Sequence, residues 1–350
     1  MDRFIVGSGR CGSTLLSLML AENPRVLSVF EFFTGLDMAR RFVPHAISGE
    51  EIAYLIAQEQ PFVTAVIRRG YRAEEITYPY APYAPHANKD DDDSGEARSR
   101  HTRDDPLPWL LVSMLPRLTQ DPDNLFDRLI AQARRQQDQL PAAHYRELFE
   151  WLGGELGRPL WIERSGSSID YLGDLVAQFP DARFLHLHRD GREVALSMRE
   201  HPVYRLPISF LYDVTLDSGK KVSELGAFDI YAPPGEDDPI TQILASRPAP
   251  AKFGCYWSDQ ILHGYHALPA LAPDQYREMR FEDLVARPGE GLREIADFFE
   301  IDAGDGAWVE QAAALVRGTP PSRFEKLSPA EQEELEEACR PGQVLLGRAQ

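Results

Sequence analysis

Residues 4 to 16 read FIVGSGRCGSTLL, a short apolar run that leads into a glycine-rich loop and then into a helix-forming segment. Gly7 and Gly12 have the spacing of the nucleotide-binding loop G-x-x-x-x-G-K-[ST], but Ser-Thr follows the second glycine where that loop begins with lysine. Successive backbone amides at the start of a helix bind anions whether or not a lysine is present. The stretch therefore predicts an anion-binding loop, in which Arg10 is the only cation.

Composition excludes several classes of protein. The chain has 350 residues, and 37 Lys plus Arg against 55 Asp plus Glu give a formal net charge of −18. Such an acidic chain without a long basic run is not expected to bind duplex nucleic acid, because phosphate neutralisation supplies most of that affinity. No run approaches the ~18 apolar residues of a membrane span. Three widely separated cysteines lack metal-ligand and disulfide spacing, which predicts a cytoplasmic protein without a metal site.

Strand-like and helix-like segments alternate along much of the chain. Four short runs rich in β-branched or aromatic residues predict strands, each followed by a polar turn and a helix-like segment: 3–6, 160–162, 183–188 and 276–281. This alternation predicts an α/β fold with a central, mostly parallel sheet flanked by helices. Residues 13–21 are good helix formers, and the helix should end before Pro24. The glycine loop thus opens a helix.

The alternation breaks between about residues 70 and 108. Tyrosines and prolines alternate there and are followed by KDDDDSGEARSRHTRDD, residues 89–105. A run of four aspartates repels itself and has little apolar surface to bury, so we expect an inserted surface loop. The tyrosines leave two interpretations open. The segment is either a lid over a substrate or a solvated insertion without a function of its own. Residues 109–157 are predicted to be mainly helical, and we expect a single domain over residues 1–350.

A second stretch, RFLHLHRDGREVALSM at 183–198, has a strand that ends at His188, a tight turn and a helix. Arg189 lies at the strand end, and Ser197 follows about two helical turns later. The two side chains would converge on one phosphate near the carboxyl edge of the sheet, where such folds bind ligands. Alternatively, Arg189 and Asp190 form a structural ion pair. The residues alone leave both alternatives open.

Together these stretches resemble the sulfotransferases that use 3′-phosphoadenosine 5′-phosphosulfate (PAPS). FIVGSGRCGSTLL looks like their 5′-phosphosulfate loop, and residues 183–198 are similar to their 3′-phosphate motif. MRFEDLVARPGEGLREIADFFEI (279–301) and SRFEKLSPAEQEELEEAC (322–339) resemble later segments of bacterial and protein-tyrosine members. The resemblance implies a P-loop-like three-layer fold. It leaves out about residues 35–155 and 200–250, the parts that usually differ by substrate.

The resemblance also implies a reaction, which is in-line transfer of a sulfuryl group from PAPS to an acceptor hydroxyl without a metal. It implies Glu31, within SVFEFFTGL, as the general base, although without the resemblance an exposed turn glutamate would be expected. Arg164, in WIERSGSS, stands where the family often has a lysine and is expected to be catalytic together with Arg10; alternatively, Arg164 pairs with a nearby acid. The residues expected to bind PAPS are Gly9, Arg10, Cys11, Gly12, Ser13, Thr14, Arg189, Ser197, Arg317 and Arg323.

The acceptor is not specified by the sequence beyond a hydroxyl of a small molecule, which is a carbohydrate, an alcohol or a lipid-like compound. Two other functions are compatible with the same loop. One is a small-molecule kinase, which the absent lysine disfavours. The other is a nucleotide-binding protein without catalytic activity. The sequence does not specify the oligomeric state.

Overall fold

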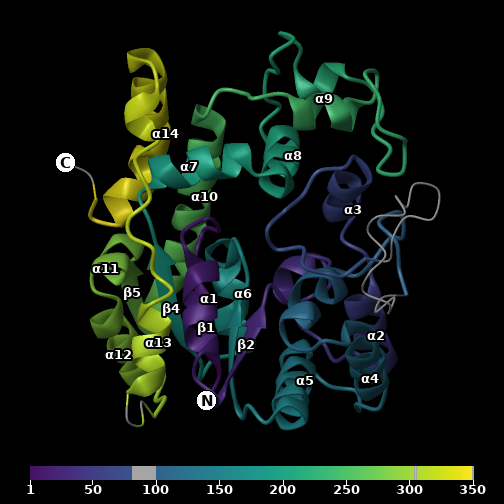
Figure 1. The fold of residues 1–350 in the computed structure, drawn as a ribbon, viewed down its shortest axis with the longest axis vertical. Helices are drawn as coiled ribbons and strands as arrows, with labels where there is room; N and C mark the ends of the chain where they lie inside the picture. The colour runs from purple at the N-terminus through teal and green to yellow at the C-terminus, as the bar shows by residue number, and fades with distance from the viewer. Residues whose placement is uncertain (81–99, 303, 305, 349–350) are drawn as a thin grey trace, which may run out of the picture.

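A five-stranded parallel sheet forms the centre of the protein, with the strand order β2-β3-β1-β4-β5 (Figure 1). The computed structural model describes residues 1–80, 100–302, 304 and 306–348, so residues 81–99 of the predicted insertion lie outside the described residues. All neighbouring strands pair in parallel, which confirms the predicted α/β class. The strands are β1 (Arg3–Val6), β2 (Val26–Phe30), β3 (Leu160–Arg164), β4 (Arg183–His188) and β5 (Tyr276–Arg280).

Helices cover both faces of the sheet because its strands are apolar on both sides. Along β1, Phe4 and Val6 belong to one buried cluster, together with side chains of α6 (Leu172–Gln178) and α10 (Ala251–Ala267). Ile5 points to the opposite face and packs with α1 (Ser13–Ala21) and α12 (Pro288–Phe298). The result is a helix–sheet–helix sandwich in three layers.

The remaining helices form groups around this sandwich (Figure 1). Beyond β2 lie α2 (Gly49–Ala57), α3 (Pro61–Arg68), α4 (Pro122–Arg134) and α5 (Pro141–Leu156). The chain after β4 forms α7 (Gly191–Glu200), α8 (Pro202–Leu211) and α9 (Pro239–Ala245). The C-terminal part holds α11 (Phe281–Ala286), α13 (Ala307–Ala313) and α14 (Pro329–Leu345), and α14 packs on α10.

Several element boundaries agree with the sequence prediction. β1, β4 and α1 span the predicted residues, whereas β3 is two residues longer and β5 ends one residue earlier, where α11 begins. The sequence analysis did not predict β2, which is the edge strand beside β3. This strand matters for the site because it ends directly before Glu31.

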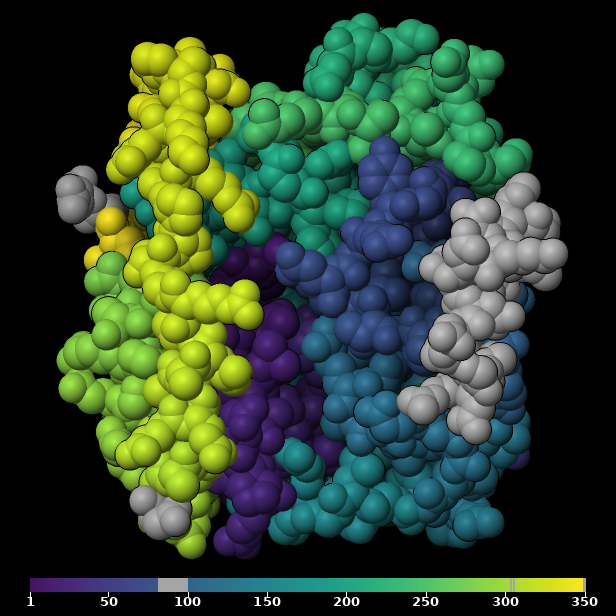
Figure 2. Space-filling model, in the orientation of Figure 1, coloured from purple at the N-terminus to yellow at the C-terminus, as the bar shows by residue number. Residues whose placement is uncertain are grey.

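The parallel strands bring their carboxyl ends to one edge of the sheet, where ligands bind in open α/β folds. Figure 2 shows residues of the N-terminal part, in purple, between the yellow C-terminal segment and the blue residues beyond β2. None of the helices that the structure describes is long and apolar enough to cross a membrane.

The loop between β1 and α1 requires glycine at position 12, which gives a first prediction. Gly12 has a φ of 95°, and a Cβ there would lie 2.1 Å from the ring of Phe281. Gly226 has a similar φ of 90° with nothing within 4 Å, so it serves as the matched control. We expect Gly226→Ala to lower the free energy of unfolding by about 1 kcal/mol. Gly12→Ala should cost about 2 kcal/mol more because the ring must move.

Urea unfolding followed by circular dichroism measures both values. Equal losses for the two variants would mean that the packing of Phe281 against this loop contributes nothing to stability.

Candidate active site

The loop after β1 has an unusual backbone that leaves amides free to meet a ligand. Gly9, Arg10 and Gly12 have φ values of 73°, 50° and 95°, in the left-handed region. Gly12 precedes α1, and no side chain caps the amides of the first helical turn. These amides carry the positive end of the helix dipole. The loop therefore has the helix-start geometry that anion binding requires, and the binding itself stays a prediction.

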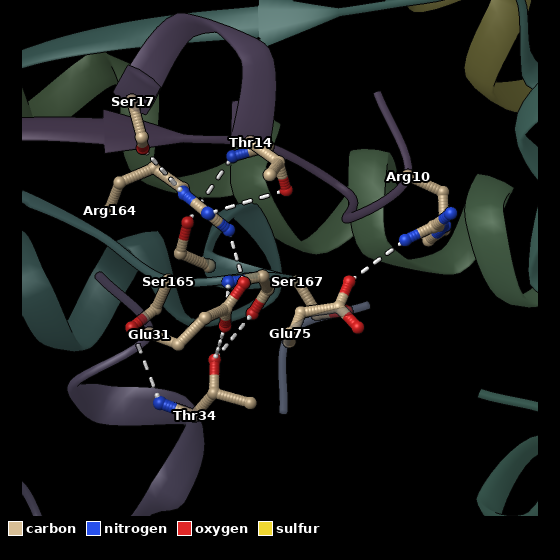
Figure 3. A network of polar contacts seen from close by, with 12 residues as sticks. Arg10, Thr14, Ser17, Glu31, Thr34, Glu75, Arg164, Ser165 and Ser167 are labelled. Carbon is tan, nitrogen blue, oxygen red and sulfur yellow. Dashed lines mark hydrogen bonds and ion pairs between the residues drawn. The ribbon is translucent and has the colours of Figure 1, made fainter. Parts of the chain in front are cut away.

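Glu31 and Arg164 form a buried ion pair across the ends of β2 and β3 (Figure 3). The strand register places Phe30 opposite Arg164, and the amide of Glu31 donates to the carbonyl of Arg164 at 2.7 Å. Arg164 Nη1 donates to one carboxylate oxygen of Glu31. The other oxygen accepts from Thr34 Oγ1 (2.5 Å) and from the amide of Gly166 (2.7 Å). Glu31 is only 5% exposed, so it is not the surface turn glutamate of the alternative interpretation.

The guanidinium of Arg164 also contacts α1, the helix that follows the glycine-rich loop. Its Nε donates to Ser17 Oγ at 3.0 Å, and its Nη2 lies 3.4 Å from Thr14 Oγ1 (Figure 3). The guanidinium lies over the ring of Phe30, 3.9 Å from its centroid. Arg164 therefore pairs with a neighbouring acid, as one sequence alternative held, and at the same time connects that acid to α1.

A second buried carboxyl group, Glu163, lies one residue before this ion pair. The Ser165 hydroxyl donates to Glu163 Oε1 and accepts from the amides of Phe33 (2.9 Å) and Thr34 (3.3 Å). Glu163 Oε2 has no hydrogen-bond partner among the described residues. Burial, reinforced by the nearby Glu31 charge, raises the pKa of Glu163 to about 8. Glu163 is thus a neutral acid at pH 7 that holds the segment after Glu31 through Ser165.

Arg10 leaves the loop toward α7 and the segment after α3. Its Nε donates to Ser197 Oγ at 3.2 Å. Its Nη1 donates to Glu75 Oε1 at 2.9 Å (Figure 3). His201 Nε2 lies 2.9 Å from the other carboxylate oxygen of Glu75. Burial alone would raise the pKa of Glu75, but the His201 hydrogen bond and the charges of His201 and Arg10 outweigh it and lower that pKa to about 2. The resemblance assigns Arg10 to the 5′-phosphosulfate loop and Ser197 to the 3′-phosphate motif of PAPS-dependent enzymes. In this structure the two side chains lie side by side.

Arg189 is a partly buried cation at the end of β4. It forms no hydrogen bond or ion pair with any residue that the structure describes, and its guanidinium lies 5.1 Å from the centroid of the Phe281 ring. Burial lowers the pKa of Arg189, the charges of Glu193 and Glu282 partly oppose this, and nearby Arg323 lowers the pKa further. Asp190 pairs instead with Arg192, at 2.7 Å, so the Arg189–Asp190 ion pair of the alternative interpretation is not formed. Arg189 and Arg323 thus place two positive charges near the end of β4.

Glu193 on α7 fixes the C-terminal segment beside Arg189. Its Oε1 accepts from the hydroxyl of Ser322 and from the amides of Arg323 and Phe324, at 2.8 to 3.0 Å. This attachment explains why Arg323 lies near Arg189. Arg317, in contrast, is exposed and forms no hydrogen bond or ion pair with the described residues.

Cys11 is the predicted loop residue whose side chain faces away from a ligand. It is fully buried, its Sγ lies 2.8 Å from the place where a Cβ on Gly7 would stand, and burial raises the pKa of its thiol. Only its backbone can therefore take part in anion binding. In the described part of the chain, no group of three or more His, Cys, Asp or Glu side chains is arranged to hold a metal ion.

Sequence reasoning missed several polar residues of this site. Four of them contact predicted residues directly: Ser17, Thr34, Glu75 and Glu193. The other three, Glu163, Ser165 and His201, contact members of this set. Thr34, Glu163, Ser165 and Glu193 lie in stretches quoted for their neighbours Glu31, Arg164 and Arg189, but the motifs give them no role. Glu75 and His201 lie in regions without a motif, and no signal in the sequence pairs them.

Comparison with known proteins gives a family match. The family model described as "Sulfotransferase family" matches residues 3–217, which contain the loop, Glu31, Arg164, Arg189 and Ser197. A search of curated proteins finds no match.

Three solved structures are similar to this chain at low identity. The sulfotransferase domain from the curacin biosynthetic pathway is 13% identical, with a TM-score of 0.48 over 99% of this chain and 98% of that chain. Sulfotransferase STF9 from Mycobacterium avium is 16% identical, with a TM-score of 0.45 over 99% of this chain and 75% of that chain. The sulfotransferase domain from the Synechococcus PCC 7002 olefin synthase is 16% identical, with a TM-score of 0.43 over 99% of this chain and 94% of that chain.

The raised pKa of Glu163 gives a prediction for stability against pH. The folded carboxyl has a pKa of about 8 and its ordinary value is 4.5, so its favourable contribution is complete below about pH 4.5 and is lost as pH rises toward about 8. Gln cannot ionise. As pH rises across this window, the free energy of unfolding of Glu163→Gln should therefore increase relative to that of the wild type by about 1.4 kcal/mol per pH unit.

Urea unfolding at about pH 5 and about pH 7.5 measures this difference, because groups common to both proteins cancel. Glu150→Gln, an exposed position on α5, is the control and should follow the wild type. A constant difference between Glu163→Gln and the wild type at the two pH values would contradict the neutral state of Glu163.

Proposed function

The chain belongs to the sulfotransferase family, and from that premise we propose that it moves a sulfuryl group from PAPS to a hydroxyl of a small-molecule acceptor, with Glu31 as the general base. Sulfotransferase activity is the family's; the donor, the acceptor and the base are the proposal. PAPS, when bound, supplies an activated sulfuryl group whose departure leaves adenosine 3′,5′-bisphosphate (PAP). The acceptor is a carbohydrate, an alcohol or a lipid-like compound.

The observation that carries the donor assignment is the cation at the end of β4, which forms no hydrogen bond or ion pair with the described residues. Arg189 is partly buried with Glu193 and Glu282 acting on it only at a distance, and Arg323 adds a second positive charge near it. A terminal phosphate satisfies both, because guanidinium groups bind phosphate oxygens through paired hydrogen bonds. The same edge of the sheet holds the uncapped loop amides, which suit a second phosphate. Two anion sites at one edge fit a donor with a 3′-phosphate and a 5′-phosphosulfate.

We assign the residues to these two ends. The loop amides bind the 5′-phosphate, and Arg10 stabilises the negative charge that develops there during transfer. The loop residues are Gly9, Arg10, Cys11, Gly12, Ser13 and Thr14. Arg189, Ser197 and Arg323 hold the 3′-phosphate, with Arg317 as a further ligand if the C-terminal segment brings it closer. Because Glu75 already binds Arg10, the donor competes with a carboxylate for this side chain.

Glu31 is the carboxylate best placed to take a proton from the acceptor. Three donors fix its two oxygens, so the carboxylate has one orientation at the edge of the sheet. Arg164 holds it from the side of α1, and the loop amides lie on the same side. Such fixed positioning is the main source of rate acceleration in group transfers of this kind. Arg164 therefore positions the base and supplies a positive charge beside the loop.

Titration calorimetry with PAP tests the donor site, with AMP and ADP as controls and no added metal. We expect tight binding that requires the 3′-phosphate. Arg189→Ala should weaken PAP binding about 10-fold to 100-fold, because it removes a charge-assisted contact. Arg192→Ala is the matched control on the same turn, since Arg192 already pairs with Asp190. Equal binding of AMP and PAP, or equal effects of the two variants, would reject the assignment of Arg189.

The role of Glu31 is tested by Glu31→Gln. We expect the variant to lose at least about 100-fold in turnover, measured as PAP release from PAPS with a panel of sugars and alcohols, because the base is removed. Its affinity for PAP should stay within about twofold of the wild type. Glu22→Gln, an exposed glutamate at the end of α1, is the control.

Removing the partner of buried Arg164 can also destabilise the fold, so the unfolding transition of Glu31→Gln is measured in parallel. A folded variant that binds PAP and keeps its turnover would eliminate Glu31 as the base.

A further inference from the structure

A tyrosine hydroxyl lies beside the proposed base, at a position that no sequence motif marks. A Cβ built on Gly166 would stand 2.7 Å from the hydroxyl of Tyr204 and 3.3 Å from each carboxylate oxygen of Glu31. A Cβ built on Gly9 would clash with the same hydroxyl, at 1.9 Å. Tyr204 therefore reaches from α8 to the loop after β1 and to the loop after β3, and two glycines leave room for it.

The backbone of Tyr204 is fixed relative to the nucleotide loop. Its amide donates to the carbonyl of His201 at 3.0 Å, in the first turn of α8. The His201 ring contacts Glu75, which in turn binds Arg10 of the loop. The ring of Tyr204 packs against that of His201, with centroids 5.6 Å apart. A chain of direct contacts thus connects the position of the tyrosine to the loop.

The hydroxyl of Tyr204 also lies near Ser167, whose Oγ lies 3.3 Å from the carbonyl of Ser8 and 3.4 Å from the hydroxyl of Tyr256. Burial, with the nearby charge of Glu31 as the next cause, raises the pKa of Tyr204 well above its usual range. The phenol is therefore neutral at physiological pH and can donate a hydrogen bond.

We propose that the Tyr204 hydroxyl positions the acceptor oxygen beside Glu31. The inference rests on the proposed function, since it uses Glu31 as the base. The Tyr204 hydroxyl and both oxygens of Glu31 border the same point beside Gly166, so they lie close enough together for one acceptor oxygen to be within hydrogen-bond reach of both. The acceptor's proton passes to Glu31, its oxygen forms the new bond to sulfur, and the bond from sulfur to the 5′-phosphate oxygen breaks. Tyr204 holds the oxygen throughout and exchanges no proton.

Water serves as the acceptor in the test, so the natural acceptor need not be known. Release of PAP from PAPS is measured for the wild type, Tyr204→Phe and Tyr256→Phe, together with PAP affinity by calorimetry. Tyr204→Phe should lower kcat about tenfold, the loss of one hydrogen bond, and leave KM for PAPS and the PAP affinity unchanged. Tyr256→Phe is the matched control, because it removes the other phenol beside Ser167 and should keep the wild-type kcat.

Gly166→Ala provides a second variant, because the φ of Gly166 is not in the left-handed region and alanine fits the backbone. Its methyl group would occupy the point between Tyr204 and Glu31, so kcat should fall at least as far as in Tyr204→Phe. Unchanged kcat in Tyr204→Phe, equal losses in Tyr204→Phe and Tyr256→Phe, or a Tyr204-containing peptide that carries a sulfate after incubation with PAPS would overturn the inference. A wild type that neither binds PAP nor releases it from PAPS would instead reject the proposed function, and this inference with it.

Discussion

The site is organised around the buried ion pair of Glu31 and Arg164. Parallel pairing of β2 and β3 places the two residues at adjacent strand ends, and a hydrogen bond from the amide of Glu31 to the carbonyl of Arg164 extends the pairing by one residue. Arg164 then reaches Ser17 and Thr14 on α1, so one guanidinium connects three elements. A buried charge left without its partner costs several kcal/mol. Neither side chain can therefore leave this arrangement without the other.

Backbone strain gathers at the same edge of the sheet. Arg10, Glu31 and Ser167 are non-glycine residues with φ values of 50°, 56° and 56°, and they follow β1, β2 and β3 respectively. Each such position costs of order 1–3 kcal/mol, and surrounding contacts must compensate for it. For Glu31 these contacts are Arg164 and the amide of Gly166, and for Arg10 they include Glu75. The strain and the ion pairs belong to one arrangement that directs polar side chains toward a ligand.

Sequence patterns predicted the parts of this arrangement that are local. The loop after β1, α1 and β4 have strong turn and periodicity signals, and their bounds agree with the structure. β2 was missed because VLSVF runs directly into EFF, with no turn residue between them, and a short apolar run alone does not distinguish a strand from a helix. The Glu31–Arg164 pair was not predictable for a related reason, since it depends on the spatial order of β2 and β3. The contacts of Glu75 and His201 depend on tertiary packing of segments 126 residues apart.

The charge distribution explains how such an acidic chain can be proposed to bind a polyanion. The net charge of −18 is spread over the surface, whereas arginines face the carboxyl edge of the sheet from four elements: the β1–α1 loop, β3, the end of β4 and the segment before α14. Partial burial strengthens the local field of these arginines relative to that of exposed carboxylates, which water and salt screen. Glu31 and Glu75 each neutralise one of the arginines by a direct ion pair. Arg189 and Arg323 form no such pair with the described residues, and the charges of Glu193 and Glu282 act on Arg189 without a direct contact. The arginines without a direct ion pair lie next to β4, so selectivity for the donor should arise there, and the Glu31–Arg164 pair beside β2 is free to serve the acceptor.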